Sequence, residues 1–203
     1  FGDEREVFTM EEAIERFDIT QVNPANSAFP IEKLDWLNGL YIREKTTVEE
    51  LAQLLREPLE AAGLEVDMDL LLRITPLVQT RIKILSEVVD LAGFFFHKEF
   101  RPPQVEDLIQ KKMDVASTKA ALEAAASLLE SLEPFDHETQ YEAMKQLAKE
   151  LGLKNTQMFG ALRVAVTGQR ISTPTFETME ILGKEESLRR IRLAIEMLAD
   201  KQA

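Results

Sequence analysis

Hydrophobic residues along this chain recur at spacings of three and four, which is the pattern of amphipathic helices rather than of strands. The clearest helix start is Thr47-Val48-Glu49-Glu50, a capping box in which the threonine hydroxyl and the last carboxylate each satisfy a free amide of the first turn. Gly63 should end this helix, because glycine takes the left-handed C-terminal position without a Cβ clash. The residues that the helix should bury are Leu51, Leu54, Leu55 and Leu59. The whole pattern predicts an all-α fold.

The other helices are predicted from capping residues, proline and glycine. Thr9 opens a second capping box, and Pro76 should divide residues 68–96 into two helices because proline has no amide donor. Thr173 and Pro174 should open the last helix as its N-cap and first helical residue, and Gly183 should interrupt it. Further helices are expected at residues 31–41, 115–132, 138–151 and 157–166, a turn at 23–26, and a boundary in the chain at Arg101-Pro102-Pro103.

Composition removes several classes of protein. The 203 residues include 45% hydrophobic residues and no cysteine, so the chain can form a sizeable core and has no disulfide, thiol nucleophile or cysteine-ligated zinc. No apolar run reaches the roughly 20 residues that span a bilayer, and the start does not resemble a signal peptide. These features favour a cytoplasmic protein, and the lack of an initiator methionine suggests a piece of a longer chain.

The formal net charge of −12 is unevenly distributed. Residues 1–72 hold 6 Lys+Arg against 17 Asp+Glu, a net of −11, whereas residues 73–203 hold 18 against 19, a net of −1. The near-neutral part could still present a basic face to a nucleic acid, because folding decides which charges cluster. On charge alone, an ordinary solvated surface is the simpler interpretation.

Residue patterns for catalysis are missing. The chain has neither a Walker-type phosphate loop nor a GxGxxG turn, and His97 and His137 are not in a metal-binding arrangement. Paired acids such as Glu11-Glu12 lie in first turns of helices, where they stabilise the helix dipole. The residues alone therefore predict a helical binding protein with no catalytic residue, metal ligand or cofactor site.

Four segments carry a recognisable pattern over nearly the whole chain. They are EVFTMEE (6–12), KLDWLNGLYIR (33–43), RIKILSE (81–87) through FFF (94–96), and LRVAVTG (162–168) followed by TPTFE (173–177) and ILGKE (181–185). In this order and spacing the chain resembles the C-terminal part of bacterial-type glutamyl-tRNA synthetases, which are ATP-dependent glutamate–tRNA ligases. The adenylate-forming motifs of that family do not occur here, so ATP and magnesium would belong to a catalytic domain before residue 1.

The resemblance implies an organisation and a partner. Residues 1–45 would be the end of the stem-contact helices, and residues 46–100 and 101–203 would be two consecutive helical bundle subdomains that bind the anticodon. The expected partner is tRNA(Glu), with tRNA(Gln) left open as a second, and the expected state is a monomer. The alternative is a helical protein-interaction adaptor without RNA binding, whose acidic first third would dock a basic partner.

The resemblance also implies which residues contact tRNA. Arg81 matches the position that reads the third anticodon base, where the fixed fork of donors of an arginine favours C over G. Thr173, Pro174 and Phe176 match a turn that packs against anticodon bases, although Thr-Pro is also an ordinary helix start. Arg163 matches an arginine near the first anticodon bases.

Two lysines complete the implied tRNA contacts. Lys145 replaces an arginine of the family and should contact only phosphate, because an ammonium is a point charge rather than a planar fork. Lys33 matches a lysine that meets the tRNA backbone. Trp36, the only tryptophan, is expected in the core, and Asn38-Gly39 is expected to end its helix.

Overall fold

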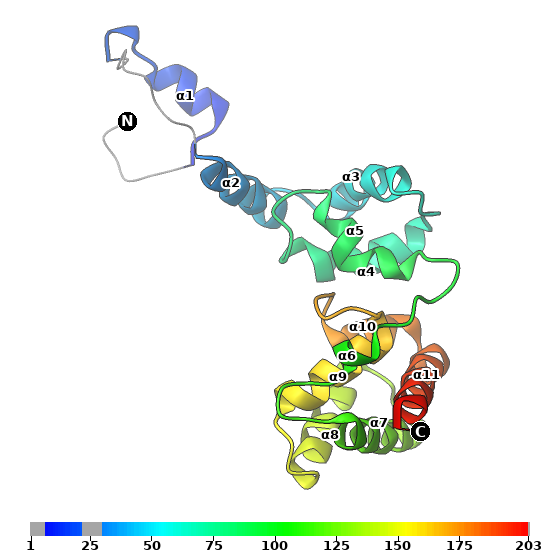
Figure 1. The fold of residues 1–203 in the computed structure, drawn as a ribbon. Coiled ribbons are helices and arrows are strands. Elements are labelled where there is room, and N and C mark those ends of the chain that lie inside the picture. Colours follow the sequence, from blue (N-terminus) through cyan, green and yellow to red (C-terminus); the bar gives the residue numbers. More distant parts are fainter. Residues whose placement is uncertain (1–6, 22–29, 203) are drawn as a thin grey trace.

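The computed structural model describes residues 7–21 and 30–202 of the chain, and these form helices and no strand (Figure 1). The all-α prediction is confirmed, and the predicted turn at residues 23–26 lies outside the described residues. The helices are α1 (Met10–Arg16), α2 (Ile31–Glu44), α3 (Val48–Ala61), α4 (Met68–Gln79), α5 (Glu87–Ala92), α6 (Val105–Leu108), α7 (Val115–Ser131), α8 (His137–Glu150), α9 (Asn155–Thr167), α10 (Thr175–Leu182) and α11 (Lys184–Gln202), with short 3-10 turns at η1 (Ile19–Gln21) and η2 (Gly93–Phe95).

The first hydrophobic core lies among α3, α4 and α5. The capping box at Thr47 is present, and Leu51, Leu55 and Leu59 form one fully buried stripe of α3 that packs on α4. Leu54 was expected in this stripe, but its side chain is 50% exposed. Residues spaced by four continue one line along a helix, and Leu54 lies off that line.

The second hydrophobic core lies among α6 to α11, where α11 packs along α7 and α9. Its interior contains several small residues of α7, such as Ala121 and Ala125, which let the helices approach closely. The predicted break at Gly183 is confirmed by its positive φ angle of 83°, and Gly168, with a φ angle of 76°, ends α9 just after the helix predicted at residues 157–166. A Cβ at Gly168 would lie 2.6 Å from the carbonyl oxygen of Arg101, so glycine is also required there by close contact.

The two cores meet across α10 and the segment at residues 101–104, which has no helix or strand. Figure 1 shows α10 on the side of the second helical unit that faces α4. Ile181 of α10 packs against the first core, and Arg73 of α4 donates a hydrogen bond to its carbonyl oxygen over 3.4 Å. Helix α10 therefore belongs to the second unit and touches the first.

Pro76 does not divide the region as predicted, because α4 runs through it to Gln79. Pro76 is exposed, so the carbonyl that loses its amide partner can be hydrated, while Ile74 and Val78 on the opposite face are fully buried. The break comes instead at residues 80–86. This displacement matters for Arg81, which lies in that break and not on a helix.

Asn38-Gly39 also does not end a helix, because α2 continues to Glu44. Gly39 is buried where another segment passes close by: a Cβ there would lie 3.3 Å from Cγ of Lys83, and the Asn38 side chain donates to the Lys83 carbonyl. Glycine is needed here for close approach rather than for a C-cap. The prediction that Trp36 is a core residue is also wrong, since it is 39% exposed.

Candidate nucleic-acid interface

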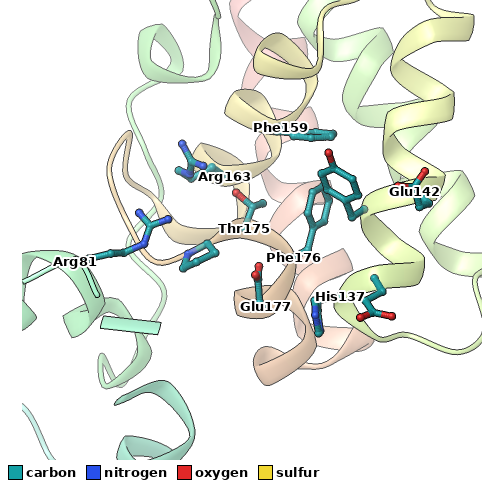
Figure 2. Close-up of a pocket in the computed structure, with 11 residues that line it drawn as sticks. Arg81, His137, Glu142, Phe159, Arg163, Thr175, Phe176 and Glu177 are labelled. Atoms are coloured by element: carbon teal, nitrogen blue, oxygen red, sulfur yellow. The ribbon is translucent and has the colours of Figure 1, made fainter. Parts of the chain in front are cut away.

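An open pocket of about 540 Å³ lies where α8, α9 and the start of α10 meet the turn that follows α4. Figure 2 shows its lining: Arg81 and Arg163 occupy one side, aromatic rings the middle, and Glu142 and His137 the other side. The pocket therefore combines a cationic side, an apolar floor and an acidic rim.

Three aromatic rings form the floor. The ring of Phe176 makes T-shaped contacts with the rings of Phe159 and Tyr141, with centroid distances of 4.9 and 5.7 Å. Phe176 is buried, whereas Tyr141 is 41% exposed and Phe159 is partly buried. The resemblance pointed to Phe176, but the more accessible ring is that of Tyr141, which sequence reasoning missed. Tyr141 lies on α8 at the edge of the face that buries Gln140 and Met144, and its position in the sequence carried no distinguishing signal.

The cationic side is formed by Arg163 of α9 and Arg81. Burial, and then repulsion from Arg81, lower the pKa of the Arg163 guanidinium. Its Nε is fully buried and has no hydrogen-bond partner in the described part of the chain. Arg81 is exposed, and its Nη1 donates to the carbonyl oxygen of Ser172 over 3.4 Å. Two arginines that face the same pocket, with no carboxylate partner among the described residues, form a site for hydrogen-bond acceptors or anions.

The start of α10 differs from the prediction. The helix begins at Thr175 with Pro174 as its N-cap, so Thr173 is not the N-cap. The Thr173 hydroxyl is buried and pairs with the Thr178 hydroxyl over 2.7 Å, and Thr178 Oγ1 also donates to the carbonyl oxygen of Pro174 over 2.6 Å. These hydrogen bonds stabilise the turn at residues 173–174 from its buried side. Pro174 lines the pocket, while Thr173 supports the turn that carries it.

The acidic rim comes from α8 and α10. His137 donates its backbone amide to Glu180 Oε2 over 2.9 Å, and its Nδ1 lies 2.7 Å from the same oxygen. The hydrogen bond to Glu180 is the main reason that the pKa of His137 is raised. Glu142 pairs with Lys145 over 3.2 Å, and Glu177 lines the pocket from α10. No sequence pattern indicated that His137, which lies far from α10 along the chain, would contact this helix.

The structure brings together four of the seven predicted contact residues. Arg81, Arg163, Pro174 and Phe176 line the pocket. Lys145 lies beside it on α8, with its Nζ 5.6 Å from the ring centre of Tyr141. Lys33 is exposed on α2, away from the pocket. Thr173 is buried in the turn before α10 and does not line the pocket.

Two other kinds of feature are absent from the described ranges, 7–21 and 30–202. No group of three or more histidine, aspartate or glutamate side chains is arranged there to hold a metal ion. Among the same residues, none of the helices has the length and apolar character needed to cross a membrane.

Comparison with known proteins identifies the fold family. The family model described as "Anticodon binding domain" matches residues 46–195, which include the pocket and most of both cores. This chain belongs to the anticodon binding domain family. The pocket lies within the matched region, and the whole of α1 and α2 lies before it.

The full-length relatives of this anticodon binding domain are glutamate–tRNA ligases. The chain is 44% identical over 195 residues to the glutamate–tRNA ligase of Roseiflexus sp. (strain RS-1), covering 93% of the chain and 38% of the relative. It is 42% identical to that of Roseiflexus castenholzii, covering 98% of the chain and 40% of the relative. The chain thus spans about two-fifths of the length of the curated relatives that it matches, in their C-terminal part.

A solved structure shares the fold. The crystal structure of a glutamate tRNA ligase from Elizabethkingia meningosepticum superposes with a TM-score of 0.78 at 26% identity, covering 97% of this chain and 38% of that one. The described helices therefore have the arrangement of the corresponding part of a glutamate–tRNA ligase.

Proposed function

We propose that this chain binds the anticodon arm of a tRNA in the pocket between α8, α9 and α10. The observation that carries the proposal is the half-buried guanidinium of Arg163, whose Nε has no partner among residues 7–21 and 30–202, in a pocket with an aromatic floor in a chain of the anticodon binding domain family. Unstacked bases of an RNA loop offer hydrogen-bonding edges to arginine and flat faces to aromatic side chains. Both kinds of contact are available here.

Individual roles follow from the positions of the predicted residues. We infer that Arg81, exposed at the pocket entrance, reads the third anticodon base, and that Pro174 and Phe176 form the apolar surface on which neighbouring bases rest. Thr173 supports the turn through its hydroxyl pair with Thr178. Lys33 and Lys145, both exposed, supply charge to phosphates of the tRNA backbone.

The glutamate–tRNA ligase relatives suggest the wider role. We infer that the chain recognises tRNA(Glu), with tRNA(Gln) as a second candidate, for a ligase that joins glutamate to tRNA with ATP and magnesium in a separate catalytic domain. Residues 1–45 would continue a stem-contact region, and residues 46–100 and 101–203 would be two anticodon-binding subdomains. A monomeric state and a cytoplasmic location complete the proposal.

The protein-interaction adaptor is not favoured. An adaptor has no need for a half-buried arginine without a partner, since an unpaired buried charge reduces stability. RNA binding explains why an arginine is kept unpaired in the cationic pocket, whereas docking of another protein does not.

Fluorescence anisotropy with two RNA hairpins tests the proposal. Both carry the tRNA(Glu) anticodon stem, and one has abasic sites at all three anticodon positions. We expect the chain to bind the intact hairpin at least about tenfold more tightly, because the bases and not only the phosphates are contacted. Equal affinity for the two hairpins, or no binding of either at low salt, would contradict the proposed function.

A further inference from the structure

Thr175, the first residue of α10, has a buried hydroxyl with no hydrogen-bond partner. The residue is only 4% exposed, it lines the pocket, and its Oγ1 is unpaired among the described residues. The neighbouring hydroxyls of Thr173 and Thr178 pair with each other, which leaves Thr175 as the odd one of the three. In Figure 2 its side chain points toward the Arg163 side of the pocket. A buried hydroxyl without a partner is uncommon and requires an explanation.

Arg163 supplies a second unpaired group in the same pocket. Its Nε is fully buried and has no partner within the described part of the chain. The two groups come from different helices, α9 and α10, yet they face one pocket. An arginine Nε can only donate a hydrogen bond, whereas a hydroxyl can donate or accept. The same pocket is therefore lined by one residue with a fixed donor and one with an adaptable group.

The surroundings favour a flat ring with a polar edge. Tyr141 and Phe159 provide apolar surface next to the two groups, and no side chain caps the first turn of α10. A pyrimidine base has the matching edge. Its O2 can accept from Arg163, and the adjacent N3 can accept from the Thr175 hydroxyl in cytosine or donate to it in uracil.

We propose that Thr175 is a specificity-determining residue whose hydroxyl, with Nε of Arg163, binds the edge of one unstacked pyrimidine of the RNA loop. This inference rests on the proposed function, because it assumes that an RNA loop enters the pocket. Since the hydroxyl can reverse its role, the site holds cytosine and uracil with similar affinity. The pocket therefore recognises the class of base at this position and tolerates either member of that class.

The test measures the affinities of the wild type and of Thr175→Val, which replaces the hydroxyl by a methyl group of similar size, for an intact RNA hairpin and three variants of it. Each variant hairpin carries a single abasic site at a different anticodon position, and the intact hairpin is the reference. Thr175→Val should weaken binding of the intact hairpin about 3- to 10-fold, the effect of one lost hydrogen bond. The loss should vanish for the one hairpin that lacks the base held in the pocket.

Two further variants of the chain serve as controls. Thr175→Ser keeps the hydroxyl and should bind like the wild type. Thr118→Val removes another buried unpaired hydroxyl, in α7 and outside the pocket lining, and should leave RNA affinity unchanged. Because the Thr175 hydroxyl makes no bond within the protein, Thr175→Val should melt at the same temperature as the wild type or higher.

The outcomes separate the two proposals. If the wild type binds and Thr175→Val loses no affinity, or loses the same factor on all four hairpins, or melts at a lower temperature, the role of Thr175 is overturned while anticodon binding stands. A wild type that binds no hairpin overturns the proposed function and this inference with it. Once the pocket base is known, exchanging cytosine for uracil there should change wild-type affinity less than about threefold, and a larger change also overturns the role of Thr175.

Discussion

Two arginines in neighbouring regions of the molecule show what a functional pocket requires. Arg190 of α11 lies at the junction of the two helical units, where its Nη1 donates to the carbonyl oxygen of Val166 over 2.8 Å and its Nε to Glu186 over 2.6 Å. Its guanidinium carbon lies 4.5 Å from the ring centre of Phe100, in the segment that joins the units. Arg190 is thus buried, with two of its three guanidinium nitrogens bonded within the protein and an aromatic ring nearby. Arg163, on the pocket, keeps its Nε unpaired.

Electrostatics emphasise the difference. Burial lowers the pKa of both guanidinium groups, but Glu186 opposes this effect at Arg190, whereas Arg81 adds to it at Arg163. Glu186 responds in turn: hydrogen bonds from Arg189 and then from Arg190 lower its pKa to about 2. Arg190, which is bonded to a carboxylate and a carbonyl, therefore stabilises the fold, whereas Arg163 is available to a ligand at some cost to the fold.

The largest expected effect is a loss of fold stability when Arg190 is replaced. Arg190→Met should reduce the free energy of unfolding by about 2–4 kcal/mol, because the Val166 carbonyl loses its partner in a buried place and Glu186 loses one of its two. Urea unfolding followed by circular dichroism measures this loss. The folded fraction should bind the intact anticodon hairpin like the wild type. A loss below about 0.5 kcal/mol would mean that the junction does not depend on Arg190.

The next effect concerns Arg81, on the cationic side of the pocket. If its guanidinium reads a cytosine, Arg81→Gln should lose about 1–3 kcal/mol of preference for C over G at the third anticodon base. Competitive binding of two hairpins that differ only at that base measures the preference. Because Arg81 is exposed and its side-chain hydrogen bond to Ser172 is long at 3.4 Å, the helical spectrum should not change. An unchanged C-to-G ratio would remove Arg81 from base recognition.

A smaller effect separates phosphate contacts from base contacts. Replacing Lys33 or Lys145 by alanine should reduce the slope of log affinity against log salt by up to about one unit each, because each phosphate contact releases counterions. Hairpin titrations over a range of salt concentrations measure the slope for Lys145, and whole tRNA is needed for Lys33, which lies away from the pocket. Preference among anticodon bases should stay the same. If neither slope changes, these lysines do not meet the RNA backbone.

The smallest effect comes from the acidic rim. Because Glu180 raises the pKa of His137 above its ordinary value of 6.5, the folded state holds the proton more tightly, so the pair stabilises the fold fully below about pH 6.5. This stability is lost as pH rises through the raised pKa. Both side chains are more than one-third exposed, so we expect only a few tenths of a kcal/mol. Thermal melts at about pH 6 and about pH 8, with Glu180→Gln as control, measure it, and an identical pH response in the control would contradict this assignment.

The helices were largely predictable from local sequence, because capping and apolar spacing act within a few residues. The capping box at Thr47 and the glycine at 168 mark true helix ends. The errors at Pro76 and Gly39 have a common cause, since each depends on a contact or an exposure that only the tertiary fold decides. Spacing alone cannot distinguish a proline on the solvent side of a helix from one that ends it.

The pocket was predictable only in part. The resemblance pointed to Arg81, Arg163 and Phe176, which come together although they lie far apart in sequence. It did not point to Tyr141 or Thr175, because their accessibility and lack of partners arise from how α8, α9 and α10 meet. Hydrogen-bond saturation is a property of the folded chain, and no sequence pattern reports it.

The most direct test is to replace Arg163, whose Nε has no partner among the described residues. Arg163→Met should weaken binding of the intact anticodon hairpin about 10- to 100-fold, the effect of lost hydrogen bonds from a charged group, and should leave the free energy of unfolding equal or higher. This is the reverse of the result expected for Arg190→Met. Anisotropy titrations and urea unfolding of the same preparation give both numbers. Unchanged RNA affinity together with a less stable fold would contradict the claim that Arg163 is kept unpaired for RNA.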